Sequence, residues 1–278
     1  MKEVAILRFY QQIINLFTLI LVLIMGGKLW ALGIASLFTF IFLFSALYFS
    51  KYRIILINIY KSINQWQINY MQEIFPFQWK IALSWISGYL IFQLFNPVLF
   101  ATEGSKIAGQ MGMTLVAING ISSISISWIN TKVPLFSRLI AKNNFLELDQ
   151  VFNKTIKQLA IINVLLTFGF IIFISFSIYF KFEIADRFLD ISLIIILGIA
   201  SFFNQFVFAW AAYLRSHKKE PFLINSTVLG ILVSISVFVS ANLYGVIGVV
   251  IGYSALTLFL GVPWAYYIFQ SKKIEWHD

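Results

Sequence analysis

The sequence has no cysteine, only two histidines and five prolines, and charged residues make up just 11% of its 278 positions. The absence of cysteine excludes disulfides, thiolate metal sites and thiol chemistry. Soluble domains carry about 25% charged residues, so this chain has too few to cover a water-exposed surface. We expect the histidines, His217 and His277, to lie far apart at aqueous edges. We therefore expect no metal site and no cofactor.

Hydrophobic residues make up 60% of the chain, and the mean hydropathy is +0.87. They form long continuous runs, and a membrane-spanning helix needs about 20 mostly apolar residues. In lipid the backbone must satisfy its own hydrogen bonds, which leaves helices or closed barrels. Barrel strands alternate apolar and polar residues, and these runs do not. The sequence therefore predicts an all-α polytopic membrane helix bundle.

Eight transmembrane helices are expected, at about residues 11–25, 29–49, 81–100, 107–127, 159–180, 191–213, 222–241 and 245–269. The first is expected to be a retained helix, because no small-residue cleavage pattern follows it. We expect residues 1–80 to form two helices with a basic loop, and residues 81–278 to form a six-helix lobe. Every lysine, arginine, aspartate and glutamate is expected to fall outside these spans.

The basic residues are distributed unequally between the two sides of this layout. Of the 20 lysines and arginines, 16 flank the spans on the side of both termini. Basic residues stay on the cytoplasmic side of a membrane. Both termini are therefore expected to be cytoplasmic, and topology accounts for the net charge of +9 without a nucleic-acid partner.

Two of the expected cytoplasmic loops are long. The loop at residues 51–80 mixes aromatic and basic residues, which favours an interfacial segment on anionic headgroups. In the loop at residues 128–158, Pro134 is expected to end the fourth helix. Asn144, with Glu147 three residues later, resembles a capping box. Apolar residues then recur at helical spacing, predicting an amphipathic helix near residues 144–158 that leads into the fifth span.

Polar side chains within the apolar spans are the candidate functional residues. Gln93 and Asn96 are three positions apart, so we expect them on one helix face, beside a bend at Pro97. Together with Gln110 they are expected to converge in a cavity. The other candidates are Asn119, Asn204 and Gln205 in the cavity, with Lys106 and Arg215 at its mouths. The alternative for each amide is a hydrogen bond between helices, worth about 0.6 kcal/mol, and we favour that alternative for Asn15, Asn163 and Asn225.

No enzyme signature is present in the sequence. There is no phosphate-binding glycine loop, no paired carboxylates within the spans and no nucleophile triad. The expected outer loops are short, which disfavours a sugar polymerase or ligase. Gly248 and Gly252 form a small-xxx-small pair and indicate close helix packing. The function is therefore expected to be binding or transport rather than catalysis.

Two stretches resemble a known family. Residues 92–100 (FQLFNPVLF) with 108–112 (AGQMG), and residues 134–141 (PLFSRLIA) with the helix after them, are similar to bacterial polysaccharide-biosynthesis membrane proteins. These are lipid-linked oligosaccharide (O-antigen-type) flippases of the multidrug/oligosaccharidyl-lipid/polysaccharide exporter superfamily. Their fold has two six-helix lobes around a central cavity. The resemblance implies that residues 81–278 form the second lobe and that the first two helices end the first lobe, without the family's first four helices.

The resemblance implies a transporter of undecaprenyl-linked oligosaccharide in the bacterial inner membrane, acting in O-antigen or lipopolysaccharide synthesis. Its expected partners are the lipid bilayer and the lipid-linked oligosaccharide, and also a second copy of the chain or other polysaccharide-assembly membrane proteins. Because the length departs from the family plan, a truncated form is one alternative. A non-transporting scaffold or partner subunit in polysaccharide assembly is another.

Overall fold

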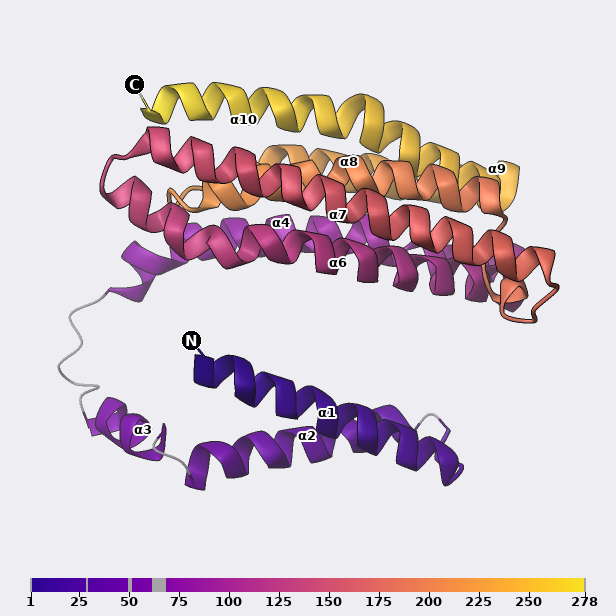
Figure 1. The fold of residues 1–278 in the computed structure, drawn as a ribbon, viewed down its shortest axis with the longest axis horizontal. Helices are drawn as coiled ribbons and strands as arrows, with labels where there is room; N and C mark the ends of the chain where they lie inside the picture. Colours follow the sequence, from indigo (N-terminus) through magenta and orange to yellow (C-terminus); the bar gives the residue numbers. More distant parts are fainter. Residues whose placement is uncertain (1, 29, 50–51, 62–68, 278) are drawn as a thin grey trace. The chain divides into compact units, whose positions relative to one another are not determined.

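A computed structural model describes residues 2–28, 30–49, 52–61 and 69–277 of the chain, and every regular element in these ranges is a helix (Figure 1). The elements, in chain order, are α1 (Lys2–Ile24), α2 (Trp30–Phe49), α3 (Tyr52–Lys61), η2 (Tyr70–Ile74), α4 (Phe75–Gln93), α5 (Phe95–Glu103), α6 (Ser105–Ala141), α7 (Phe145–Tyr179), η3 (Ala185–Arg187), α8 (Ile191–Arg215), α9 (Leu223–Ala255), η4 (Leu256–Gly261) and α10 (Val262–His277).

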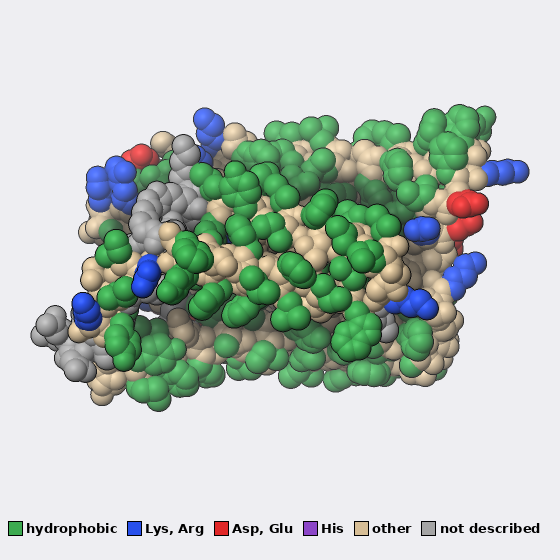
Figure 2. Space-filling model, turned by 90° about the horizontal axis from the view of Figure 1, so that it is seen from below, with side chains coloured by type: hydrophobic (Ala, Val, Ile, Leu, Met, Phe, Trp, Pro, Cys, Tyr) green, Lys and Arg blue, Asp and Glu red, His purple; other side chains and the backbone are tan. Residues whose placement is uncertain are grey.

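Seven helical segments in the described ranges are long and apolar enough to cross a membrane. On the surface seen in Figure 2, hydrophobic side chains dominate, and charged side chains gather near the helix ends. Lipid is the solvent that such a surface requires. The chain is thus an all-α, multi-pass membrane protein, as the sequence predicts. One correction is that the helices run past the expected boundaries, so charged residues such as Arg8, Lys106 and Arg138 lie within the candidate spans Ile6–Ile24 and Ser105–Ala141.

The chain divides into two compact units, residues 1–68 and 69–278. In the first, α1 and α2 form a hairpin whose turn contains Gly26 at φ 82°. The amide of Asn15 donates a 3.1 Å hydrogen bond to the Thr39 hydroxyl. This bond between helices is the structural role expected for Asn15. Part of the predicted interfacial loop forms α3, whereas Trp66, which belongs to the same prediction, lies outside the described residues.

The second unit opens with a broken helix. Helix α4 ends at Gln93 and α5 starts at Phe95. Pro97 has no backbone N–H to donate to the carbonyl of Gln93, four residues earlier, so the helical ladder is interrupted there. The predicted bend before Pro97 is therefore confirmed. Gln93 therefore ends α4, and Asn96 belongs to the first turn of α5.

Helices α6 and α7 meet in a tight turn. Pro134 was expected to end its helix, but it lies inside α6, which continues to Ala141. Only one hydrogen bond is lost at a proline, and the fully buried side chains of Ile129 and Phe136 hold the helix on both sides of it. The N-cap is confirmed, since the Asn144 side chain accepts from the Glu147 N–H at 3.3 Å. The reciprocal bond of a capping box is replaced, because the Glu147 carboxylate accepts from Nδ2 of Asn144 at 2.7 Å and not from its backbone N–H.

The predicted amphipathic helix is the first part of α7. Leu148 and Leu159 on its apolar face are fully buried, and Phe152 is 3% exposed. They pack with residues of α6, α8 and α10 in one hydrophobic cluster. The helix is therefore continuous with the fifth span, and its apolar face belongs to the protein core.

Helix α9 is a helical hairpin that folds back at Gly245, where φ is 59° and ψ is −145°. A Cβ on Gly248 would lie 2.7 Å from the Ser240 carbonyl oxygen, and one on Gly252 would lie 2.5 Å from the Ser236 hydroxyl. The two arms are therefore antiparallel and in close contact, as the small-residue pattern predicts. The last candidate span, Leu223–His277, thus contains the seventh and eighth predicted helices.

The α6–α7 turn, the α8–α9 turn and the end of α10 lie together at one end of the second unit, which we call the basic end (Figure 1). Both histidines lie there. The expectation that they are far apart is wrong, because their ring centroids are 5.5 Å apart. The antiparallel path of α8, α9 and α10 returns the chain to the end at which His217 lies. No group of three or more metal-ligating side chains occurs in the described ranges.

Candidate functional site

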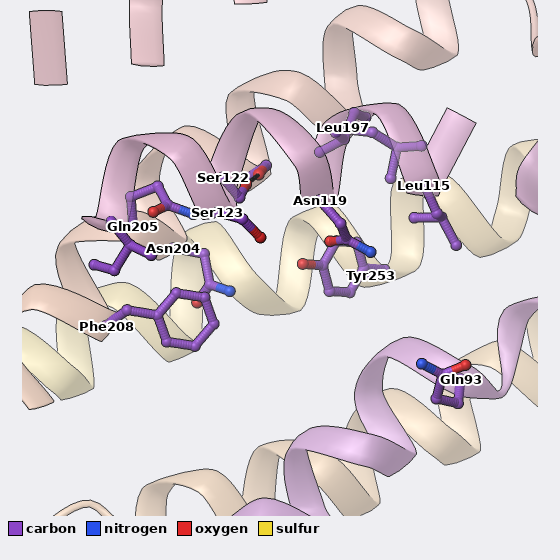
Figure 3. Close-up of a pocket in the computed structure, with 13 residues that line it drawn as sticks. Gln93, Leu115, Asn119, Ser122, Ser123, Leu197, Asn204, Gln205, Phe208 and Tyr253 are labelled. Atoms are coloured by element: carbon purple, nitrogen blue, oxygen red, sulfur yellow. Dashed lines mark hydrogen bonds between the residues drawn. The ribbon is translucent and has the colours of Figure 1, made fainter. Parts of the chain in front are cut away.

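A polar cavity of about 310 Å³ lies between α4, α6, α8 and α9 in the second unit. Eight of the 13 residues that line it carry an amide or a hydroxyl group: Gln93, Asn119, Ser122, Ser123, Ser201, Asn204, Gln205 and Tyr253. Figure 3 shows Asn119, Ser123 and Tyr253 near one another, with Gln93 apart from them on α4. Gln93 and Asn119 are exposed, whereas Gln205 and Tyr253 are buried. The cavity is therefore open on one side and has a buried floor.

Most of the amides in the polar cavity are available to a ligand. The side chains of Gln93, Asn119 and Asn204 make no hydrogen bond to any described residue. Gln205 is 1% exposed, and its Oε1 atom has no partner. Buried amide groups normally find a partner, and leaving one unpaired costs about 1–3 kcal/mol. A bound polar ligand would supply the missing bonds.

A second, more apolar cavity of about 500 Å³ adjoins the first and shares Gln93, Asn204, Phe208 and Tyr253 with it. It extends along α4, α8 and α9 toward the basic end, and its wall includes Trp85, Tyr89, Leu229 and Val233. The two cavities together give one amphipathic groove. Amides lie at one end, apolar and aromatic side chains line the middle, and a few polar side chains, among them Arg215, lie at the basic end.

Arg215 lines the second cavity at the basic end. Its guanidinium makes two hydrogen bonds to Glu220, one through Nε and one of 3.0 Å through Nη2. The Glu220 side chain is fully buried, whereas that of Arg215 is 33% exposed. A fork of parallel N–H donors on a carboxylate fixes both groups. Arg215 is therefore held in place and keeps part of its surface toward the cavity.

The structure brings some of the predicted site residues together and separates others. Gln93, Asn119, Asn204 and Gln205 share the polar cavity, and Arg215 lines the second. Gln110 instead donates a 2.9 Å bond to the Asp186 carbonyl. Asn96 lies against Gly112, and Lys106 is exposed and lines neither cavity. The expected convergence of Gln93, Asn96 and Gln110 does not occur, because Asn96 and Gln110 contact other groups and line neither cavity.

Hydrogen bonds between helices frame the polar cavity. Ser122 and Ser201 pair at 2.9 Å, and the Asn163 amide donates to Ser125 at 3.2 Å. Asn163 therefore has the structural role expected for it. The expected role of Asn225 does not follow, since its Nδ2 atom is buried without a partner.

Sequence reasoning missed several lining residues. None of Ser84, Trp85, Ser122, Ser123 and Tyr253 was among the predicted site residues. No local pattern separates these residues from others of the same type, because their roles depend on which helices become neighbours. The pairing of α4 with α9, through Ser84 and Ser226 at 3.0 Å, joins residues 142 positions apart.

The arrangement suits a neutral, hydroxyl-rich ligand attached to an apolar chain. Amide side chains donate and accept hydrogen bonds without charge. Ligand sites are generally apolar clefts with a few well-placed polar groups, as here. Among the residues that the structure describes, Tyr253 is the only titratable side chain that lines the polar cavity. Comparison of the chain with protein-family models, curated proteins and solved structures finds no match.

Proposed function

We propose that this protein is a transporter that moves an undecaprenyl-linked oligosaccharide across the bacterial inner membrane for O-antigen or other surface polysaccharide synthesis. The observation that carries the proposal is the set of three unpartnered amides, Gln93, Asn119 and Asn204, in one open cavity between apolar helices. The resemblance of residues 92–100 and 134–141 to the flippase family agrees with it.

Sugar hydroxyls and amide side chains are complementary hydrogen-bonding groups. In a membrane, polar residues are costly and face a bundle interior or a cavity. Three amides without protein partners are consistent with transient binding of a polar ligand in the cavity, within the membrane. The neighbouring Phe208 and Tyr253 rings offer apolar faces to a sugar ring. The proposed mechanism is alternating access, in which helices rock around the cavity.

The proposed orientation places the basic end in the cytoplasm. Basic residues at this end of the second unit are Lys80, Lys132, Arg138, Lys142, Lys154, Lys157, Arg215, Lys218, Lys219, Lys272 and Lys273, whereas the opposite end carries Lys106, Lys181 and Arg187. The positive-inside rule then sets the orientation. Both termini are cytoplasmic in this proposal.

The proposal is tested by surface polysaccharide export in a strain that lacks the gene and is complemented by variants. Asn119→Ala with Asn204→Ala should reduce export at least tenfold at equal protein level, since two bonds to the ligand are lost. Asn96→Ala with Gln110→Ala is the matched control, because both amides lie outside the cavities. Polysaccharide export in the strain with this control variant should remain near the wild-type level.

Three outcomes would contradict the proposal. If deletion leaves export unchanged, the protein does not act in this process. If deletion abolishes export but the Asn119/Asn204 variant restores it fully, the protein acts as a non-transporting scaffold. Equal losses in the cavity variant and the control would show that the effect is not specific to the cavity.

A further inference from the structure

The second cavity contains a polar corner at the basic end. Arg215, Ser84, Asn225 and Ser226 line it from three helices. The Nη2 atom of Arg215 lies 3.5 Å from the Ser84 hydroxyl, and that hydroxyl lies 3.0 Å from Ser226. The corner is thus a connected group of hydrogen-bonding side chains, separate from the amides of the polar cavity.

The Asn225 side chain is the least satisfied member of this corner. Asn225 is 2% exposed, lines the cavity, and has an Nδ2 atom without a partner. Asn163 is equally buried, but its Nδ2 donates to Ser125. A buried amide N–H₂ group without a partner is an unused donor, and it requires an acceptor that the protein itself does not provide.

The corner favours a negatively charged acceptor. Asn225 lies in the first turn of α9, where the unpaired backbone N–H groups and the helix dipole attract anions. The cap residue, Phe222, offers no side-chain hydrogen bond to these groups. The bonds of Arg215 to Glu220 and Ser84 use Nε and Nη2. Its Nη1 donors have no partner among the described residues.

The remainder of the cavity is apolar and begins directly beside this corner. Trp85, Leu229 and Val233 line it, and Trp85 is 71% exposed. A small free anion would gain nothing from contact with these apolar side chains, whereas an acyl chain would pack against them. At the basic end, anionic headgroups and basic side chains attract each other. The shape and charge therefore match an amphiphile with an anionic head.

We propose that this corner is a binding site for an anionic glycerophospholipid. The phosphate accepts hydrogen bonds from Asn225, Ser84 and Arg215, and one acyl chain lies along Trp85, Leu229 and Val233. The site would retain a membrane lipid as a bound component of the protein. The phosphate contacts none of the unpartnered amides of the polar cavity, while the acyl chain lies in the apolar part of the groove that the two cavities share.

The test is native mass spectrometry of the purified full chain with equal amounts of phosphatidylglycerol and a diacylglycerol, which has the same acyl chains but no phosphate. Wild type should retain one phosphatidylglycerol in roughly tenfold preference, the effect of one hydrogen bond to a charged group. Asn225→Leu should remove this preference while the thermal stability stays equal or rises, since it removes an unsatisfied buried group. Ser84→Ala should weaken the preference and serves as the second variant.

Asn163→Leu is the matched control. It removes an equally buried amide that has a partner and lies outside both cavities, so stability should fall and the lipid preference should remain. Equal retention of the two lipids by wild type would overturn the proposal, and so would an unchanged preference in both Asn225→Leu and Ser84→Ala. Displacement of the lipid by millimolar inorganic phosphate would also overturn it, because the acyl chain would then contribute nothing.

Discussion

The hydroxyl of Tyr213 donates a 2.6 Å hydrogen bond to Oδ1 of Asp149. The other carboxylate oxygen of Asp149 pairs with Lys273 at 2.7 Å. These contacts join α7, α8 and α10 at the basic end, where the Phe152 and Phe269 rings pack around the fully buried Tyr213. One carboxylate therefore links three helices that are far apart in the sequence.

Replacing Tyr213 with phenylalanine removes this bond and keeps the ring packing. We expect Tyr213→Phe to lower the free energy of unfolding by about 1–2 kcal/mol, because the bond is to a charged group that stays partly exposed. Denaturant titration of the protein in detergent measures the change. Tyr266→Phe is the control, since Tyr266 is half exposed and should change stability by less than about 0.5 kcal/mol. Equal effects of both variants would contradict this role.

Gly245 is required at the tip of the α9 hairpin. A Cβ at position 245 would overlap the Glu103 carboxylate. That carboxylate accepts a 2.7 Å hydrogen bond from the Val246 N–H. The φ of 59° and ψ of −145° also suit only glycine. Gly245→Ala should lower the free energy of unfolding by roughly 2 kcal/mol or more, measured by thermal unfolding. Gly109→Ala, in open space on α6, should be neutral or stabilising.

The stability of the basic end should depend on pH through His217. Burial lowers the pKa of His217 below its ordinary value of 6.5, and the nearby His277 and Lys219 charges act in the same direction. The folded state therefore binds this proton less readily than the unfolded state, so the free energy of unfolding falls as the pH drops below about 6.5. Denaturant titrations at pH 7.5 and 5.5 measure this difference in the free energy of unfolding.

His217→Gln should reduce the pH dependence of unfolding, because glutamine does not titrate. A steeper loss of stability at pH 5.5 in this variant than in wild type would contradict the assignment. The change per proton cannot exceed about 1.4 kcal/mol for each pH unit.

The two ends of α7 should lie on opposite sides of the membrane. This helix has 35 residues, about 50 Å at 1.5 Å each, which exceeds the hydrocarbon thickness of a bilayer. Reporter fusions after Lys142 and after Lys181 should report different compartments, with Lys142 cytoplasmic. The same compartment for both fusions would overturn the topology and the proposed orientation.

Local signals predicted local structure well. The capping pair Asn144 and Glu147 starts α7 as expected, and Pro97 marks the break between α4 and α5. Pro134 failed as a helix end because buried neighbours on both sides compensate for one lost hydrogen bond. A proline signal is decisive only where packing does not oppose it.

The candidate site was only partly predictable. Asn119, Asn204 and Gln205 were identified because an amide within an apolar span is unusual. Their grouping with Gln93, and the exclusion of Asn96 and Gln110, follow from the way the helices pack. Asn163 and Asn225 are indistinguishable by local pattern, yet one has a partner and the other does not.

The sequence by itself determined that the chain is a helical, multi-pass membrane protein, because composition and the length of apolar runs decide which solvent a chain can tolerate. Only the tertiary structure decided that His217 meets His277, that Glu103 caps the second arm of the α9 hairpin, and which amides remain free. Such contacts join residues far apart in the chain. They depend on which faces of the helices pack together, and hydropathy carries little information about that choice when nearly every face is apolar.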